Sequence, residues 1–186
     1  LTPAENLKKI FKKYQKQKNT LISSEEQKEI TLQDISYYES ILYGIENSES
    51  IEELEEVKSE LIKSDSKTKT KEKSQPQKFN YNGFDIYIGK NSKQNDFLIS
   101  KIANGEDLWF HGLNFPSSHV ILKVPNNKQE PTPDVLEYCA KLTKENSKAK
   151  NSGKTSIIMT KRKNLKKPPN TYLGYVTYKN ETEIVI

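Results

Sequence analysis

The sequence predicts an α+β protein: a compact mixed-sheet domain with about two helices, preceded by a long helical segment of coiled-coil type. Three observations support this. Apolar residues recur at seven-residue spacing within residues 1–64. Residues 65–78 hold no apolar side chain apart from one proline and are expected to form a flexible linker. Residues 79–186 alternate short apolar runs with turn residues and one amphipathic helical pattern.

The N-terminal segment opens with Thr2-Pro-Ala-Glu5, a capping box with proline at the first helical position. One side of the expected helix carries residues seven apart: Leu7, Tyr14, Leu21, Lys28, Ile35 and Leu42. So thin a stripe must pack against another helix, so we expect a partner helix from the rest of a longer chain or from a dimer. A restart after residues 23–27 is the alternative to one continuous helix. A second capping box at residues 50–53 opens a short acidic helix that ends near Lys63.

The compact domain begins with a hairpin, because Asn82-Gly83 is a strong two-residue turn signal between two strands. A helix is expected to open near Asn91 or Ser92. The further expected elements are strands at residues 107–111 and 119–124, a helix at 131–147, a strand at 155–160 and a closing hairpin at 174–186. Cys139 lies on the apolar stripe of that second helix, which favours a buried small hydrophobe over a nucleophile.

The net charge of +5 conceals a segregation of charges along the chain. Six lysines and one glutamate give residues 1–20 a charge of +5, and two lysines and twelve acids give residues 21–62 a charge of −10. Nine lysines, one arginine and one glutamate give residues 141–167 a charge of +9. Such a basic cluster is typical of a phosphate-binding protein, and lysine favours salt-sensitive backbone contact over base reading. An AT-rich codon bias would explain the choice of lysine but not its clustering.

Residues 89–95 read Gly-Lys-Asn-Ser-Lys-Gln-Asn, a glycine turn between a strand and a helix. Free amides at such a turn attract anions, and phosphate is the commonest biological anion. Lys90 and Lys93 lie beside the turn, together with the neutral groups of Asn91, Gln94 and Asn95. The alternative interpretation is an ordinary connection, capped by Asn91, whose lysines are solvated.

Residues 107–111 read Asp-Leu-Trp-Phe-His, and in an extended strand alternate side chains face opposite ways. Leu108 and Phe110 then face the core, while Asp107, Trp109 and His111 share the other face. An acid, an indole and an imidazole in one row suit an outward platform on which a base or sugar stacks. In the alternative interpretation Trp109 belongs to the core, and Asp107 only orients His111 or a backbone amide.

Three ordered motifs together resemble the signature of the NFACT family, whose bacterial members are also described as fibronectin/fibrinogen-binding proteins. They are Gly89-Lys90-Asn91…Gln94-Asn95-Asp96, Asp107-Leu-Trp109-Phe-His111 and Pro116-Ser117-Ser118-His119. The likeness is strong over residues 80–186 and looser over residues 1–64. The one departure is Ser117, where the family usually has glycine. If that turn needs a positive φ, serine costs about 1 kcal/mol there.

The resemblance implies the RNA-binding domain and the end of the middle coiled coil of a ribosome-associated quality-control factor. Such factors bind large ribosomal subunits obstructed by peptidyl-tRNA, recruit tRNA and promote C-terminal tailing of the stalled chain. Expected partners are therefore the large subunit and tRNA or rRNA, in the cytoplasm or a plastid stroma, with no membrane, cofactor, metal or catalytic residue. The expected RNA contacts are Lys90, Asn91, Lys93, Gln94, Asn95, Asp107, Trp109, His111, Ser118, His119, Lys161, Arg162, Lys163, Lys166 and Lys167.

Two other functions fit the sequence less well. A surface adhesin that binds fibronectin is disfavoured by the lack of a visible export signal and by the single cysteine. A metal-dependent RNA hydrolase would use Asp107, His111 and His119 as ligands. Asp107 and His111 lie about 13 Å apart on a straight strand, too far to share one ion. No apolar run approaches the roughly 20 residues that a membrane span needs.

Overall fold

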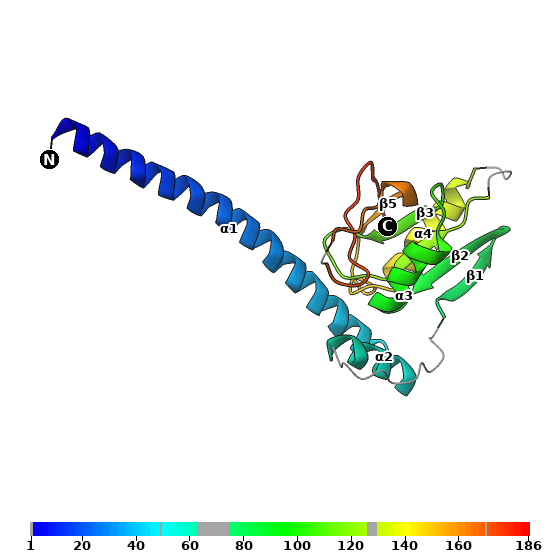
Figure 1. The fold of residues 1–186 in the computed structure, drawn as a ribbon. Coiled ribbons are helices and arrows are strands. Elements are labelled where there is room, and N and C mark those ends of the chain that lie inside the picture. The colour runs from blue at the N-terminus through cyan, green and yellow to red at the C-terminus, as the bar shows by residue number, and fades with distance from the viewer. Residues whose placement is uncertain (1, 49, 63–74, 126–129, 170) are drawn as a thin grey trace. The chain divides into compact units, whose positions relative to one another are not determined.

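A computed structural model describes residues 2–48, 50–62, 75–125, 130–169 and 171–186 (Figure 1). By its internal contacts the chain divides into two compact units, Leu1–Ser36 and Tyr37–Ile186. The boundary between the units lies at residues 36–37, earlier than the expected division at residue 64. The last turns of the first helix, up to Glu46, therefore belong to the second unit. The expected linker falls mostly on residues 63–74, which lie outside the described residues.

The long helix α1 (Pro3–Glu46) is confirmed and runs without interruption for 44 residues. Its capping box forms as expected: the Glu5 N–H donates to Thr2 Oγ1 over 3.3 Å, and the Thr2 N–H donates to Glu5 Oε2 over 2.7 Å. The alternative restart after residues 23–27 does not occur. The apolar side chains of the stripe lie exposed along the helix: Leu7, Ile10, Phe11, Tyr14 and Leu21.

The second unit is built on a six-stranded sheet in the order β1-β2-β4-β3-β5-β6, and every recorded pairing is antiparallel. The α+β class is confirmed. Asn82 (φ 47°) and Gly83 (φ 79°) form the predicted tight turn between the first two strands. The strands are β1 (Gln77–Tyr81), β2 (Phe84–Gly89), β3 (Leu108–Gly112), β4 (His119–Leu122), β5 (Ser156–Lys161) and β6 (Thr182–Val185).

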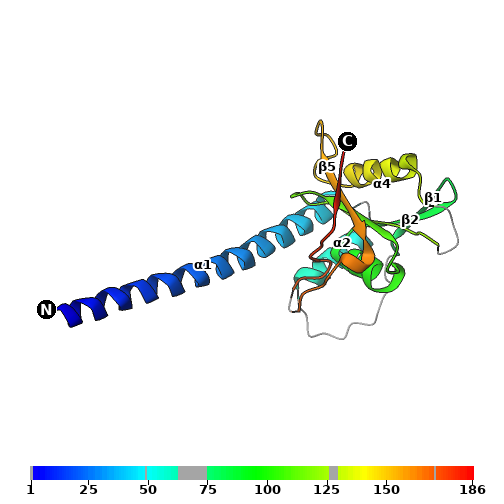
Figure 2. The same cartoon turned by 90° about the horizontal axis from the view of Figure 1, so that it is seen from above.

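Helix α4 (Pro133–Glu145) covers one face of the sheet (Figure 2). Its apolar stripe, which includes Val135 and Cys139, packs against sheet residues such as Phe110 and Val120. Burial raises the pKa of the Cys139 thiol to about 12, so the thiol stays protonated at neutral pH. The prediction that Cys139 acts as a buried hydrophobe is confirmed.

The opposite face of the sheet is also covered. Helix α3 (Ser92–Phe97) continues directly into the π-helical turn η1 (Leu98–Ile102), and η1 packs on this face. A short 3-10 turn η2 (Arg162–Asn164) follows β5 and brings Leu165 against the same cluster. The sheet is therefore enclosed between two apolar layers, one formed with α4 and the other with η1 and Leu165.

The predicted closing hairpin is wrong in its first strand. Only β6 joins the sheet, pairing with β5, while residues 174–178 are irregular and form one isolated β-bridge, between Lys166 and Thr177. Gly174 explains the difference, because its φ of 74° turns the chain out of extended geometry. The carbonyl oxygen of Ser92 lies only 3.1 Å from the position of a Cβ at Gly174, so this segment packs close to α3.

Helix α2 (Ile51–Leu61) is the second predicted helix of the N-terminal segment. It begins with Ser50 as N-cap, whose Oγ accepts the Glu53 N–H over 3.2 Å. Buried Val57 packs where α1 has Gly44, with 3.4 Å between its methyl carbon and an ideal Cβ there. Among the described residues, no helix has both the length and the hydrophobicity needed to cross a membrane.

Candidate nucleic-acid interface

The glycine turn at residues 89–95 has the geometry expected of a capped helix start. Asn91 is the N-cap of α3 and accepts the Gln94 N–H over 2.9 Å, and Gln94 Oε1 accepts the Lys90 N–H over 2.9 Å. Asn95 Oδ1 accepts the backbone N–H of His119 over 3.2 Å. A Cβ at Gly89 would lie 2.3 Å from Asn95 Oδ1 and 2.9 Å from its backbone nitrogen, so glycine is required by close approach.

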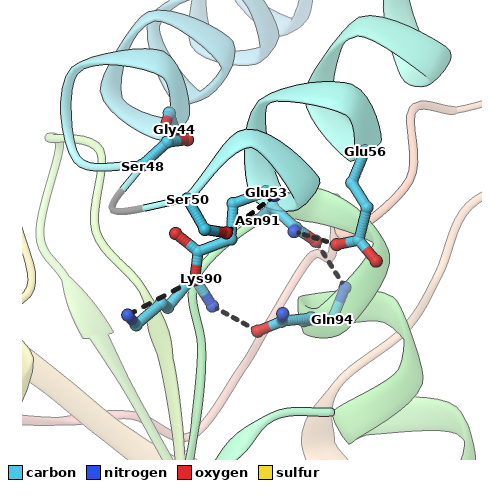
Figure 3. Close-up of polar contacts among 8 residues, drawn as sticks. All are labelled: Gly44, Ser48, Ser50, Glu53, Glu56, Lys90, Asn91 and Gln94. Atoms are coloured by element: carbon cyan, nitrogen blue, oxygen red, sulfur yellow. Dashed lines mark hydrogen bonds and ion pairs between the residues drawn. The ribbon is translucent and has the colours of Figure 1, made fainter. Parts of the chain in front are cut away.

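The polar ends of this turn face α2. Lys90 Nζ lies 3.5 Å from Glu53 Oε1, and Asn91 Nδ2 donates to Glu56 Oε2 over 2.8 Å (Figure 3). Lys93 Nζ donates to the backbone carbonyl of Glu56 over 3.4 Å. The alternative interpretation is therefore correct about the Asn91 cap but wrong about the lysines, which contact α2. An acidic helix from earlier in the chain lies against the groups that were expected to meet phosphate.

The indole of Trp109 is sealed inside the second unit, with 1% of its surface exposed. It lies in a cluster with Leu98, Ile121, Ile158 and Leu165. The expected outward platform is therefore wrong for this residue, and the alternative interpretation of a core tryptophan is confirmed. The physical reason is the second apolar layer, because η1 and the chain after β5 cover the face to which Trp109 points.

Trp109 and His111 nevertheless lie together, as the alternation along their strand predicted, and His119 from β4 joins them. Trp109 and His111 stack at 5.4 Å between centroids with 7° between planes. His119 meets both edge-on, at 5.3 Å from Trp109 and 5.1 Å from His111. Because His119 and Trp109 are buried, this arrangement cannot stack a base on the indole without opening the layer above it.

The ring cluster is electrically neutral near pH 7. Burial lowers the pKa of His111 to about 4, and burial together with the neighbouring His111 holds the pKa of His119 well below its ordinary value. His111 Nδ1 lies 2.8 Å from the Gly112 carbonyl oxygen, which places the proton of the neutral ring on Nδ1. Trp109 Nε1 and His119 Nδ1 are buried and have no hydrogen-bond partner among the described residues, which costs about 1–3 kcal/mol for each such group.

Asp107 turns away from the histidines and ties two chain segments together. Its carboxylate accepts the backbone N–H of Asn104 over 2.7 Å and that of Val124 over 2.8 Å, and it pairs with Lys123 Nζ at 2.5 Å. This saturated carboxylate does not join His111 in a shared metal site. In the part of the chain that the structure describes, no three His, Cys, Asp or Glu side chains gather as a metal site requires.

The Ser117 turn does not carry the expected strain. Of the described non-glycine residues, only Asn82, Asn114 and Asn180 have positive φ, so serine at position 117 is unstrained. Its Oγ accepts the Gly112 N–H over 2.8 Å and thereby ties the turn to the end of β3. Neighbouring Ser118 is buried and donates its N–H to the Asn146 carbonyl over 2.9 Å.

The basic residues at 161–167 are largely engaged by the chain itself. Lys161 and Lys163 both pair with Glu106, at 2.8 and 2.6 Å, and together they lower the pKa of that carboxyl to about 2. Arg162 donates its Nε–H to the Ile99 carbonyl over 2.7 Å. These contacts were not foreseen, because Glu106 comes 55 residues before Lys161 in the chain.

Two further lysines complete this loop. Lys167 pairs with Asp96 in α3, whereas Lys166 is exposed and has no ion pair among the described residues. Exposed pairs of this kind are worth about 0–1 kcal/mol, so a lysine in one can exchange its carboxylate for a phosphate. The predicted phosphate contacts at residues 161–167 therefore stay predictions.

Most of the basic cluster predicted at residues 141–167 belongs to a longer stretch that holds no acidic residue. Residues 146–180 contain eight lysines, one arginine and no acidic residue. Within them, Lys150 and Lys154 are exposed, and the described residues offer them no ion pair. Lys154 also lines a shallow groove of about 470 Å³ beside Phe115 and Lys148. The absence of acidic residues from 146–180 is visible in the sequence and could have identified this surface.

Comparison with known protein families identifies the domains to which these motifs belong. The model described as NFACT protein RNA binding domain matches residues 77–180, and the model of the NFACT N-terminal and middle domains matches residues 1–78. The chain belongs to the NFACT family. The resemblance identified from the three motifs is thereby confirmed, and it extends over the helical segment as well.

Individual NFACT relatives agree with this assignment. The chain is 29% identical over 195 residues to the Rqc2 homolog RqcH of Bacillus subtilis and 33% identical over 190 residues to that of Streptococcus suis. These matches cover 100% and 97% of the chain but only 33% of each relative, so the chain spans about a third of their length. It is also 33% identical over 104 residues to coiled-coil domain-containing protein 25 of Danio rerio, covering 54% of the chain and 50% of that protein.

A solved structure extends the likeness to three dimensions. The C-terminal part of the fibronectin/fibrinogen-binding protein from Streptococcus suis matches all of this chain and 76% of that one. The TM-score is 0.81 at 31% sequence identity. This NFACT chain and the streptococcal protein therefore share both the long helical segment and the compact domain.

Proposed function

We propose that this chain is the RNA-binding part of a cytoplasmic, ribosome-associated quality-control factor. In this proposal it binds large ribosomal subunits that are obstructed by peptidyl-tRNA, together with tRNA, and supports C-terminal tailing of the stalled chain. The observation that carries the proposal is the match of residues 77–180 to the NFACT RNA-binding domain. The basic surface at residues 146–180 supplies the electrostatics that an RNA backbone requires.

Binding in this proposal is mainly to phosphates. The exposed cations are almost all lysines, which act as point charges and do not read base edges with a planar fork. The motif residues Asn91, Gln94, Asn95 and Asp107 serve the fold directly, since each accepts or donates hydrogen bonds within the domain. We propose that these four residues hold the lysine-bearing turns in place. They contact RNA only through those polar atoms that remain accessible at the surface.

In this proposal the 186-residue chain by itself binds RNA but does not carry out the tailing of a stalled nascent chain. About two thirds of each RqcH relative lies outside the matched region, and we propose that the tailing step needs those other parts. The exposed stripe of α1 would then pack against a helix from the remainder of the chain or from a second copy.

A salt series with the whole 186-residue chain tests the proposal. Binding of tRNA and of large ribosomal subunits is measured by fluorescence anisotropy or sedimentation between low and physiological salt. We expect the logarithm of the affinity to fall linearly with log salt, with a slope of about −2 to −4 for three to five phosphate contacts on single strands. Absence of RNA binding at low salt would contradict the proposal.

Fibronectin belongs in the same experiment as a second ligand. The streptococcal protein of similar structure is named for fibronectin and fibrinogen, which makes an adhesin the second candidate function. Binding of fibronectin that persists as salt rises, without binding of tRNA, would favour the adhesin. We expect the reverse, because the lysine-rich surface attracts polyanions and offers few exposed apolar anchors in the compact domain.

A further inference from the structure

The acidic helix α2 presents three carboxylates on one face. Glu53, Glu56 and Glu60 stand three and four residues apart, so they line one side of the helix with an axial rise of about 4.5 to 6 Å between neighbours. All three are partly covered, whereas the neighbouring Glu52 is exposed. This face therefore forms a short row of anions directed at one surface of the same chain.

The surface it meets is the glycine turn and the start of α3. Glu53 lies against Lys90, and Glu56 accepts the side-chain amide of Asn91 (Figure 3). Lys93 reaches both the Glu56 carbonyl and the Ser59 hydroxyl. The donors that α2 engages are thus two ammonium groups and an amide, which are the groups an RNA backbone would use.

The attachment of α2 rests little on apolar packing. Val57 is its one buried apolar residue, at 3% exposure, while Ile51, Leu54 and Leu61 remain 72%, 42% and 47% exposed. The Lys90–Glu53 contact is long at 3.5 Å, and such partly exposed pairs contribute only about 0–1 kcal/mol. The attachment is made mainly of polar contacts, one of them an ion pair, and other anions can take the place of such contacts.

We infer that α2 is a displaceable cover, whose oxygen atoms (the carboxylates at Lys90 and Asn91, a carbonyl and a hydroxyl at Lys93) occupy the positions that RNA phosphates take when RNA binds. The inference rests on the proposed RNA-binding function and deepens it, because it assigns the turn to phosphate and α2 to competition with phosphate. Only molecules in which α2 has left this surface can bind RNA there. The apparent affinity for RNA is therefore the intrinsic affinity multiplied by the fraction of such molecules. RNA and α2 therefore exclude each other from this surface.

The test compares two charge-matched variants of the whole chain. Glu53→Gln with Glu56→Gln removes the two contacting carboxylates while keeping the shape and an oxygen that accepts from Asn91. Glu25→Gln with Glu26→Gln removes two exposed carboxylates from α1 and serves as the control for the general gain in positive charge. Affinity for a fluorescent single-stranded RNA is measured for both variants and the unaltered chain. We expect the α2 variant to bind roughly tenfold more tightly than the control.

Hydrogen exchange provides a second readout that net charge alone does not change. Amides of α2 in the unaltered chain should exchange faster when RNA is added, because seated α2 is released. Equal affinities of the two variants, or α2 amides equally or better protected with RNA, overturn the inference while leaving RNA binding intact. Failure of all three proteins to bind RNA overturns both the inference and the proposed function.

Discussion

The residues of the three motifs mainly contact one another. Gly89 allows Asn95 to approach, Asn95 holds the backbone of His119, and Ser117 holds that of Gly112. Trp109 joins these segments through its ring contacts with the two histidines. The motif residues therefore join three stretches of chain at one place. Their strict spacing reflects this internal network at least as much as contact with a ligand.

Buried His119 and partly buried His111 make stability depend on pH. The pKa of His111 is about 4 in the folded chain against about 6.5 when unfolded, so the unfolded state binds more protons between these values. The stabilising contribution is present above pH 6.5 and is lost as pH falls toward 4. We expect the free energy of unfolding to drop by up to about 1.4 kcal/mol per pH unit for each histidine.

Urea unfolding at pH 7, 6 and 5 measures this dependence. The chain contains only two histidines, so His111→Gln should flatten the slope visibly in this interval. The Glu106 carboxyl, whose pKa is lowered from 4.5 to about 2, contributes to the slope mainly below pH 5, where the unfolded chain binds the proton. If the free energy of unfolding of His111→Gln depended on pH as steeply as that of the unaltered chain, the ring cluster would not be the source of the pH dependence.

At the scale of elements, α1 and α2 differ in how they satisfy their exposed faces. α2 finds its partner within the second unit through Val57 and its carboxylates. The first unit consists of α1 alone, and its apolar stripe lies open along its length. A long single helix with exposed aromatic residues is not stable by propensity alone, because helical stability in proteins comes mainly from packing. The stripe therefore needs a second helix.

We predict that the 186-residue chain self-associates through α1 when no other partner is supplied. Sedimentation equilibrium should detect a dimer at high micromolar concentration, and Leu7→Ser with Phe11→Ser should abolish it because both residues lie on the stripe. Lys9→Ser with Lys12→Ser changes nearby residues off the stripe and should leave association unchanged. A chain that stays monomeric at all concentrations would contradict the prediction.

At the scale of the whole molecule, charge is both segregated along the sequence and partly cancelled in the fold. Glu106 balances Lys161 and Lys163, and Asp96 balances Lys167. Within the acid-free residues 146–180, Lys150, Lys154 and Lys166 are exposed and have no ion pair among the described residues. The net positive potential that attracts RNA is therefore not distributed as the sequence clusters suggest.

This distribution predicts a difference between two lysine pairs. Lys150→Gln with Lys154→Gln should weaken RNA binding and reduce the salt slope by about 0.7 for each phosphate that the variant no longer neutralises. Lys161→Gln with Lys163→Gln should have a smaller effect, because those lysines already share Glu106. Both variants remove two charges, so titration of one RNA at one salt concentration compares them directly. A stronger weakening by the second pair would refute this assignment.

Short-range sequence patterns were enough to predict the local elements and which side chains share a face. Capping at Thr2, Ser50 and Asn91, the turn at Asn82-Gly83 and the alternation in residues 107–111 all depend on short-range rules. The grouping of Trp109 with the histidines followed from the same two-residue period. The family resemblance also rested on spacing along the chain, which is why the motifs alone were enough to identify it.

What covers each face, and which charges meet, depends on contacts between distant segments and became visible in the folded chain alone. Periodicity indicated which side chains lie together, but not that η1 and Leu165 would close over Trp109. Nor could it place Glu56 on Asn91 or Glu106 on Lys161, because those partners lie 35 and 55 residues apart. Burial and ion pairing depend on how distant segments pack, and side-chain spacing along one strand or helix carries no information about the layer above it.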